Sequence, residues 1–599
     1  MKRTMTFETW ATILLVALAA AIYLGSAGIP SLLDDADSLY AEVAREMTQS
    51  RDWITPYANT IRYLEKPPLF YWLIALSYIV SGAANAFTAR LPTALATIGL
   101  IFVTFKIGKL LFGFRAGLLG GLALATSLGM FLFTRIVLPD ALVSLLLALI
   151  LYAFLCWERA EKKTGPLLWI YALAGLAVMA KGLIGIVFPG AIMFVTLAVT
   201  GRIKDVLKII SFKGILIFLA IAVPWHILAG QRNPGFYWFY FINEHVLRFL
   251  GKRYPKDYGT IPLVPFWLLH LVWLFPWSIY LATFCWPSNF KRALAEHGRN
   301  LALPLAWALV ILLFFSFSSR LEYYTMPALP AMALLAGMQC ASFWKRERNW
   351  PGLVLAVLGA LAGIACLAIA VLVSAGTAGK SFGLTSQPDL YRYYFGHLLD
   401  LTQESLLELR VPLVMAGIAF GVAFPLHYLI KRAEARVAAL GLGMALFFAA
   451  ANIAFLTFVP RMTSEPLARE LNRRLDARST IIIDGEYAEA SSAAFYTRQT
   501  VLLHNGRMTT LEFGSYYPDA PPLFIDSDKL RQLWNETDRR IFFITKREQL
   551  DSLLPQAKFV IARYGDKILL SNRPDQIART SSNALNKERD LRESRARIN

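Results

Sequence analysis

The sequence has few charged residues for its length. Only 17% of its 599 residues are charged, whereas about a quarter is usual for a soluble protein. Apolar runs of roughly 20 residues, the length needed to cross a bilayer as a helix, recur along most of the chain. The low charge therefore excludes a soluble globular protein, and the apolar runs predict a polytopic α-helical membrane protein.

Cysteine is scarce, and the common nucleotide and zinc motifs are absent. All four cysteines lie within or at the end of an apolar run: Cys156, Cys285, Cys340 and Cys366. Such cysteines act as small core residues, so we expect neither disulfides nor a metal cage. The chain has no Walker A loop, no Rossmann fingerprint and no HExxH motif, which argues against nucleotide-driven chemistry.

The formal net charge is strongly positive, at +19. A nucleic-acid-binding protein would carry a basic patch interleaved with aromatic residues on a soluble fold, and the sequence shows no such patch. Basic loops on the inner side of a membrane and a basic tail account for the charge instead. We therefore expect membrane lipids as partners and no nucleic acid.

The apolar runs predict about 13 membrane-spanning helices. Their approximate limits are 8–28, 91–111, 117–133, 141–157, 168–180, 184–199, 215–227, 264–284, 302–317, 324–343, 353–373, 411–430 and 438–458. The run 69–80 is short for a span. If it lies in the plane of the membrane, five later basic loops all fall on the inner side. Lys2 and Arg3 place the N-terminus inside, so an odd number of spans places everything after residue 458 outside.

The chain changes character after the last span. Between residues 478 and 572, short β-branched runs such as STIIIDG and RRIFFIT alternate with turn residues and helical patterns. This pattern predicts a small α/β domain. We expect a transmembrane domain at 1–460, with outer juxtamembrane helices at about 34–84 and 235–252, the α/β domain at 461–575, and a disordered basic tail at 576–599.

The first outer loop concentrates charge. Asp34, Asp35 and Asp37 follow the first span, and Glu65 and Lys66 precede two prolines. The prolines restrict the backbone, so this turn is stiff, and rigid loops are where binding and catalytic residues collect. An acidic cluster at a membrane surface could also be merely solvated.

The four following outer loops each add charged or polar residues close to the membrane. They supply Asp140 in RIVLPDAL, Lys181 in MAKGLIG, Glu244, His245 and Arg248 in EHVLRF, and Arg320 and Tyr324 in SSRLEYYTMP. Ionisable residues at membrane depth are costly and usually functional. Several cations facing one pocket would bind the phosphate of a lipid, and a carboxylate nearby could act as general base.

Several of these residues also have a structural interpretation. Lys181 and Arg320 could extend to lipid headgroups. Asp140, after Pro139, could cap the helix that follows. His245 could be an interfacial histidine with its hydrogen bonds satisfied. The topology alone leaves these alternatives open.

The order of the motifs resembles that of a known family. YAEVAREM, DWITP, RYLEKPPLFYW, RIVLPDAL, MAKGLIG, EHVLRF and LEYYTMPALP follow one another within residues 1–345. This series is similar to bacterial members of the protein O-mannosyltransferase superfamily, above all the lipid A aminoarabinose transferases. The resemblance implies an inverting glycosyltransferase of the class C fold in the bacterial inner membrane, with its active site and its C-terminal domain in the periplasm.

The resemblance also implies roles for individual residues. It places the catalytic base in the first-loop motif, which reads DDAD here; we assign Asp35 first, Asp37 second and Asp34 third, with Asp140 as a supporting acid. The residues expected at the donor phosphate are Lys66, Arg248 and Tyr324, which match family positions, and Lys181 and Arg320, which the topology adds. Glu65 and His245 match positions that hold a divalent metal such as zinc in some relatives, although the reaction requires no cofactor.

The sequence therefore predicts a monomeric enzyme that moves a sugar from polyprenyl (undecaprenyl) phosphate to lipid A or another envelope glycolipid. One alternative is a protein O-glycosyltransferase that uses the same donor. A second, of another class, is a lipid-phosphate transporter or flippase, which would also need a cationic pocket but commonly shows paired halves. A phosphotransferase acting on lipid diphosphates is a third. Only a glycosyltransferase converts the donor into free polyprenyl phosphate and a heavier acceptor.

Overall fold

The computed structural model describes residues 6–575 apart from 162, 256–259, 347–348, 375–406, 537, 548–549, 552 and 555–557. The basic tail expected at 576–599 lies outside the described residues. Two compact units make up the chain. The first comprises Met1–Leu32, Tyr40–Tyr57 and Arg62–Val459, and the second comprises Leu33–Leu39, Ala58–Ile61 and Pro460–Asn599. Two short segments of the first loop thus belong to the second unit, which the sequence did not predict.

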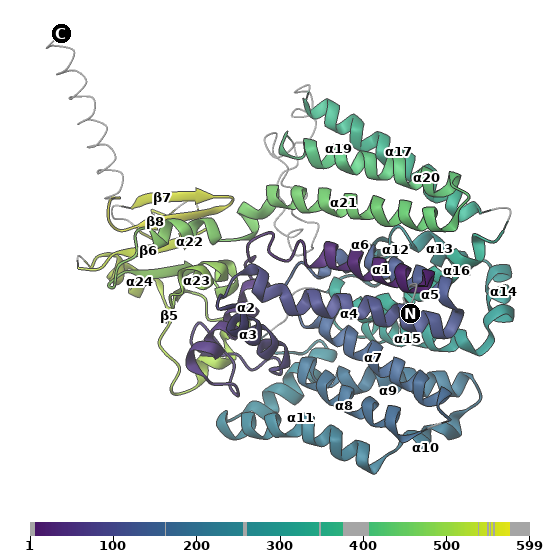
Figure 1. Ribbon diagram of the computed structural model, residues 1–599. Helices are drawn as coiled ribbons and strands as arrows, with labels where there is room; N and C mark the ends of the chain where they lie inside the picture. Colours follow the sequence, from purple (N-terminus) through teal and green to yellow (C-terminus); the bar gives the residue numbers. More distant parts are fainter. Residues whose placement is uncertain are drawn as a thin grey trace, which may run out of the picture. The chain divides into compact units, whose positions relative to one another are not determined.

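The chain from α1 to α11 comprises the first helix, the elements of the first loop and the helices that follow it (Figure 1). In chain order the elements are α1 (Phe7–Tyr23), α2 (Ala36–Ser50), β1 (Tyr57–Ala58), β2 (Ile61–Arg62), α3 (Leu69–Ser81), α4 (Ala86–Phe112), α5 (Phe114–Ala125), α6 (Leu128–Phe133), α7 (Asp140–Arg159), α8 (Thr164–Lys181), α9 (Ile184–Val199), α10 (Val206–Ile209) and α11 (Phe212–Arg232).

The chain from residue 238 to 462 begins with a π-helix and continues mainly with α-helices, of which α17 packs along α19 and α20. The elements are η2 (Trp238–Leu247), α12 (Leu263–Trp273), α13 (Ser278–Ala282), α14 (Pro287–His297), α15 (Ala302–Ser316), η5 (Glu322–Ala328), α16 (Leu329–Phe343), α17 (Trp350–Ser374), α19 (Arg410–Ile418), α20 (Phe424–Leu429) and α21 (Ala433–Met462).

Within the described residues, nine helical segments are long and apolar enough to cross a membrane. These nine, together with the shorter apolar helices α1, α5, α9 and α12, coincide in position with the 13 predicted spans. The multi-pass helical membrane fold is therefore confirmed, while the number of crossings stays a prediction. Helix α3 has 13 residues and a length of about 20 Å, too short for a hydrocarbon core of about 30 Å.

Two predicted spans are interrupted. The run 117–133 breaks between α5 and α6, and the run 264–284 breaks after α12, at Pro276. The two breaks face each other: the Leu128 N–H donates to the Phe275 carbonyl at 3.2 Å, and the Trp277 indole donates to the Thr126 hydroxyl at 2.9 Å. Backbone groups freed from a helix inside a membrane need such partners, so the two irregular segments stabilise one another.

Helices α5 and α16 approach closely because glycines meet at their contact. A Cβ atom on Gly337 would lie 2.3 Å from the backbone nitrogen of Gly120, so α16 cannot carry a side chain at that point. Small residues at helix contacts let backbones approach in membranes, where dispersion replaces the hydrophobic effect as the main attraction. The core around them includes the fully buried side chains of Trp157, Trp273 and Trp307.

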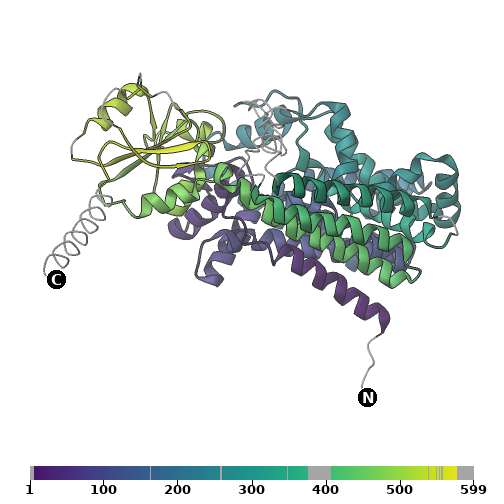
Figure 2. The same cartoon turned by 90° about the horizontal axis from the view of Figure 1, so that it is seen from above.

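The second unit is the α/β domain that the sequence predicted (Figure 2). Its six-stranded sheet has the order β5-β4-β3-β6-β8-β7, in which the first four are parallel and β8 is antiparallel to its neighbours β6 and β7. The strands are β3 (Thr480–Asp484), β4 (Leu502–His504), β5 (Phe524–Ile525), β6 (Ile541–Thr545), β7 (Phe559–Tyr564) and β8 (Lys567–Ser571), and the helices are α22 (Glu465–Asn472), α23 (Ser491–Thr497) and α24 (Ser527–Trp534). Every residue of β6 is buried, as expected for a central strand covered on both faces.

Candidate functional site

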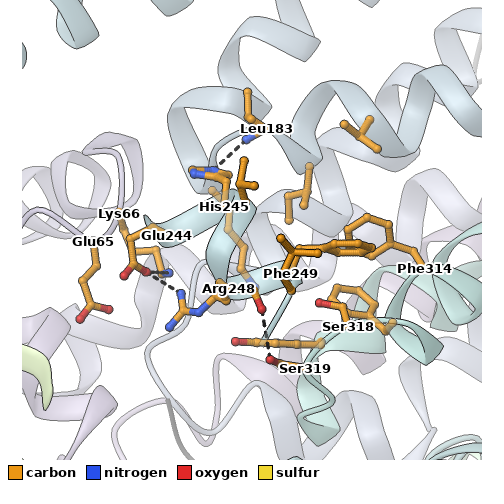
Figure 3. A pocket seen from close by; sticks show the side chains of 17 residues that line it. Glu65, Lys66, Leu183, Glu244, His245, Arg248, Phe249, Phe314, Ser318 and Ser319 are labelled. Atoms are coloured by element: carbon orange, nitrogen blue, oxygen red, sulfur yellow. Dashed lines mark hydrogen bonds and ion pairs between the residues drawn. The ribbon is translucent and has the colours of Figure 1, made fainter. Parts of the chain in front are cut away.

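The helical unit contains a cavity of about 370 Å³ with one charged side and one apolar wall (Figure 3). The charged side is formed by Glu65, Lys66, Lys181, Glu244, His245 and Arg248, and Tyr324 and two serines also line the cavity. The apolar wall is formed by Leu183, Ile184, Val187, Val246, Phe249, Leu250, Phe314 and Phe315. Residues from the first, third, fourth and fifth predicted outer loops are thus brought together in one place.

A chain of buried ion pairs organises the charged side. The Glu244 carboxylate accepts hydrogen bonds from Arg248 Nη1 at 2.8 Å and from Arg253 Nε at 2.6 Å. Arg253 also donates through Nη2 to Glu65 Oε1 at 2.7 Å, and Lys66 Nζ lies 3.9 Å from Glu244 Oε2. Three cations and two carboxylates leave one net positive charge, which suits an anionic ligand with a single charge.

Burial and neighbouring charges shift the ionisation of this cluster. Burial, together with the positive charge of Arg248, lowers the pKa of Lys66 from its usual 10.5 to about 8. Burial alone would raise the pKa of Glu244, but the charges of Arg248, Arg253 and Lys66 lower it overall. Because this pKa lies close to neutral pH, the charge of Lys66 changes when an anion binds beside it or when the cavity loses water.

Lys181 occupies the last turn of α8 and pairs with Asp140 in the first turn of α7. Its ammonium group also lies 5.1 Å from the ring centre of Tyr324 and 5.8 Å from that of Tyr323. The N-cap of α7 is Pro139, so Asp140 does not cap this helix and instead holds Lys181. The second oxygen of this buried carboxylate, Oδ2, accepts no hydrogen bond from the part of the chain that the structure describes.

His245 is fixed by two backbone contacts. Its Nδ1 lies 2.6 Å from the Tyr240 carbonyl, and its Nε2 accepts a hydrogen bond from the Leu183 N–H at 3.2 Å. A carbonyl only accepts and an amide only donates, so the ring is neutral with its proton on Nδ1. Burial likewise lowers the pKa of His245. Gly182 (φ +85°) is required beside it, because a Cβ atom there would lie 2.2 Å from Nε2.

The predicted metal site at Glu65 and His245 does not fit these contacts. Both ring nitrogens of His245 are engaged, so this ring has no lone pair left for a metal, and Glu65 Oε1 already accepts from Arg253. Across the described residues, no group of three or more histidine, cysteine or carboxylate side chains could hold a metal ion. Both residues line the cavity through the contacts described above.

Arg320, also predicted at the donor phosphate, makes other contacts. It does not line the cavity, and its guanidinium donates to the carbonyls of Ile261 at 2.6 Å and Ser316 at 3.1 Å. Sequence reasoning chose Arg320 and missed Arg253, which lies only nine residues after Glu244 in the same predicted loop. Each of the two arginines lies in a predicted outer loop, so the sequence offers no reason to prefer one over the other. Only the partners seen in the structure distinguish them.

The three acids of the first-loop motif belong to the second unit. The side chain of Asp34 is 9% exposed and pairs with Lys567. Asp35 is exposed at the start of α2, with a φ of +67°. Asp37 is buried and accepts a hydrogen bond from the Leu33 N–H at 2.8 Å. The order of preference among them stays a prediction.

The chain is similar to several known membrane transferases. Residues 65–228 match the family model for dolichyl-phosphate-mannose-protein mannosyltransferase. The undecaprenyl phosphate-α-4-amino-4-deoxy-L-arabinose arabinosyl transferases of Serratia proteamaculans and Shewanella sediminis are each 28% identical, over 63% and 59% of this chain. The alignments cover 68% and 63% of the lengths of these two relatives.

A solved structure has the same fold. It is the crystal structure of ArnT from Cupriavidus metallidurans bound to undecaprenyl phosphate, with a TM-score of 0.78 and 23% identity, over 95% of this chain and 99% of that protein. At this identity the likeness shows the fold. Together with the family match and the curated relatives, it confirms the resemblance to the protein O-mannosyltransferase superfamily and its aminoarabinose transferases.

Proposed function

We infer that this relative of the protein O-mannosyltransferases is a membrane glycosyltransferase that takes its sugar from undecaprenyl phosphate. The observation that carries the inference is the cavity, which joins Lys66, Lys181 and Arg248 to an apolar wall. Such a site suits a phosphate attached to an isoprenoid tail, because guanidinium and ammonium groups bind the phosphate oxygens and the wall packs on the first prenyl units.

The donor and acceptor are proposed from the relatives. The Serratia and Shewanella proteins are named for undecaprenyl phosphate-linked 4-amino-4-deoxy-L-arabinose, so this sugar is the proposed group transferred. Lipid A, or another glycolipid of the bacterial envelope, is the proposed acceptor. We expect a monomer in the inner membrane. Its site lies on the periplasmic side, since the loops predicted on the other side carry the basic residues.

The reaction is a single displacement with inversion. An oxygen of the acceptor attacks the anomeric carbon, the bond from that carbon to the phosphate oxygen breaks, and undecaprenyl phosphate leaves. Negative charge grows on the departing phosphate, where Lys66, Lys181 and Arg248 stabilise it. Asp35, with Asp37 next, takes the proton from an acceptor hydroxyl or orients an acceptor phosphate.

Product analysis tests the proposal. The purified chain is reconstituted in vesicles with undecaprenyl phosphate-linked aminoarabinose and lipid A, and both lipids are followed by mass spectrometry. We expect free undecaprenyl phosphate together with lipid A that is heavier by one sugar. Lys181→Met and Arg248→Met should each lower turnover roughly 100-fold, as for other transition-state contacts, whereas exposed Lys208→Met should not. Unchanged masses in the presence of donor movement across the vesicle would instead identify a flippase.

The assignment of the base has its own test. Asp35→Asn should abolish most turnover while donor binding is retained, because the amide keeps the shape of the side chain and loses its charge. Asp37→Asn is the second variant. If both variants transfer the sugar at the wild-type rate, the acidic motif does not contain the base.

A further inference from the structure

Residues of the second unit hold the acidic motif through Asp34. The Asp34 carboxylate accepts hydrogen bonds from the Ser492 N–H at 2.8 Å, the Ser492 hydroxyl at 2.7 Å and the Ser464 hydroxyl at 2.9 Å, and it forms an ion pair with Lys567. Only 9% of the Asp34 side chain and 3% of the Lys567 side chain are exposed. Four donors occupy about all the lone-pair positions of a carboxylate, so none is left for a substrate.

The next residue, Asp35, is held by residues at and just before the start of α23 (Ser491–Thr497). The Asp35 N–H donates to the Ala488 carbonyl at 3.2 Å and to the Ser491 hydroxyl at 2.9 Å, and the hydroxyls of Ser38 and Ser491 are 2.7 Å apart. Asp35 has a φ of +67°, in the left-handed region that few residues with a side chain adopt. Ser491 and Ser492, at the start of α23, thus hold two consecutive aspartates.

We propose that Asp34, Ser492 and Lys567 are positioning residues for the glycosyl transfer, through which the C-terminal domain sets the direction of the catalytic carboxylate. This rests on the proposed function, in which the acidic motif supplies the base. Because Asp34 directly precedes Asp35 in the chain, fixing one carboxylate fixes the backbone that carries the next. The C-terminal domain is then part of the catalytic apparatus even if it binds no acceptor.

Neutralising the ion pair one partner at a time tests the proposal. Lys567→Met leaves the Asp34 carboxylate buried without its cation, so the motif shifts, and kcat should fall about 100-fold, as for other displacements near 1 Å. KM for the donor should not change, because the donor contacts lie on other residues. The double variant Asp34→Asn with Lys567→Met leaves no unpaired charge and should recover kcat about tenfold over Lys567→Met alone.

The recovery separates a positioning residue from a base. If Asp34 itself were the base, Asp34→Asn and the double variant would both be inactive, and the proposal would be overturned. A double variant no faster than Lys567→Met would also overturn it. Lys558→Met is the matched control, since Lys558 pairs with the exposed Asp551 at the surface of the same unit, and its kcat should stay within about twofold of the wild type.

Two further measurements keep the test decisive. If Lys567→Met does not fold, Ser492→Ala takes its place, and a wild-type kcat in that variant would count against the proposal. Amide hydrogen exchange of residues 33–39 in the full chain should be faster in either variant than in Lys558→Met. If the wild type transfers no sugar, the proposed function fails while exchange still reports on the anchoring of the motif. If it transfers sugar and the anchoring variants keep full kcat, the present inference alone fails.

Discussion

The charge of Lys66 makes donor binding sensitive to pH in a range where few other groups titrate. Burial, together with Arg248, lowers its pKa to about 8. A bound phosphate needs the protonated amine, so kcat/KM for the donor should fall as the pH rises through 8, by about tenfold per pH unit at most. A charge-assisted hydrogen bond contributes about 1.5–3 kcal/mol, so the fall should end at a level roughly 10- to 150-fold below the maximum.

The effect on stability has the opposite sign. The pKa of Lys66 is about 8 in the folded protein against 10.5 as its usual value. Between these values the unfolded chain binds more protons than the folded one, so the contribution of Lys66 to the free energy of unfolding rises with pH. A loss of activity in this window therefore cannot come from unfolding driven by Lys66.

Lys66→Arg and Lys66→Met separate Lys66 from other titrating groups. Arginine stays charged throughout the range, so its profile should lack the fall above pH 8. The methionine variant should already show the low level at pH 7. The assay is release of undecaprenyl phosphate from the donor between pH 6.5 and 9.5, with melting of each variant followed in parallel. The donor's own amine titrates equally in all three proteins, so the profiles are compared with one another. A fall of the same size in the wild type and in the arginine variant would refute the role of Lys66.

Two further predictions concern neighbours of the cavity. Arg253→Met leaves two buried carboxylates without their shared cation and should lower the free energy of unfolding by about 3–5 kcal/mol. The control, exposed Arg232→Met, should change it by less than about 1 kcal/mol. Equal melting shifts in the two variants would contradict the buried pairing. Gly182→Ala should displace His245 and reduce kcat. The control, Gly165→Ala, should not, because its added Cβ meets no atom within 4 Å. Full activity in both variants would show that the turn at Gly182 tolerates a side chain.

The sequence by itself determined the helical membrane fold and the α/β domain. An apolar run long enough to cross a bilayer is a local property, because each backbone group in lipid must be satisfied within its own helix. The predicted run 141–157 lies within α7 (Asp140–Arg159) for this reason. Alternating β-branched runs are equally local, and β3 and β6 lie where they occur.

The sequence also indicated which residues would meet, but not how they would pair. The resemblance to the family selected Lys66, Arg248 and Tyr324, and the side of the membrane on which each loop lies selected Lys181; all four line the cavity. The same reasoning selected Arg320, whose side chain turns to backbone carbonyls instead. Topology places residues at one surface of the membrane and leaves their orientation within that surface open.

Only the tertiary structure decided the partners. The residues joined by the Asp34–Lys567 pair are separated by 533 positions in the chain, and no periodicity or spacing connects them. Arg253 likewise became recognisable only once Glu65 and Glu244 were seen on either side of its guanidinium. A buried charge takes the partner that the packing of distant segments brings within hydrogen-bonding distance, and that distance is a property of the folded chain alone.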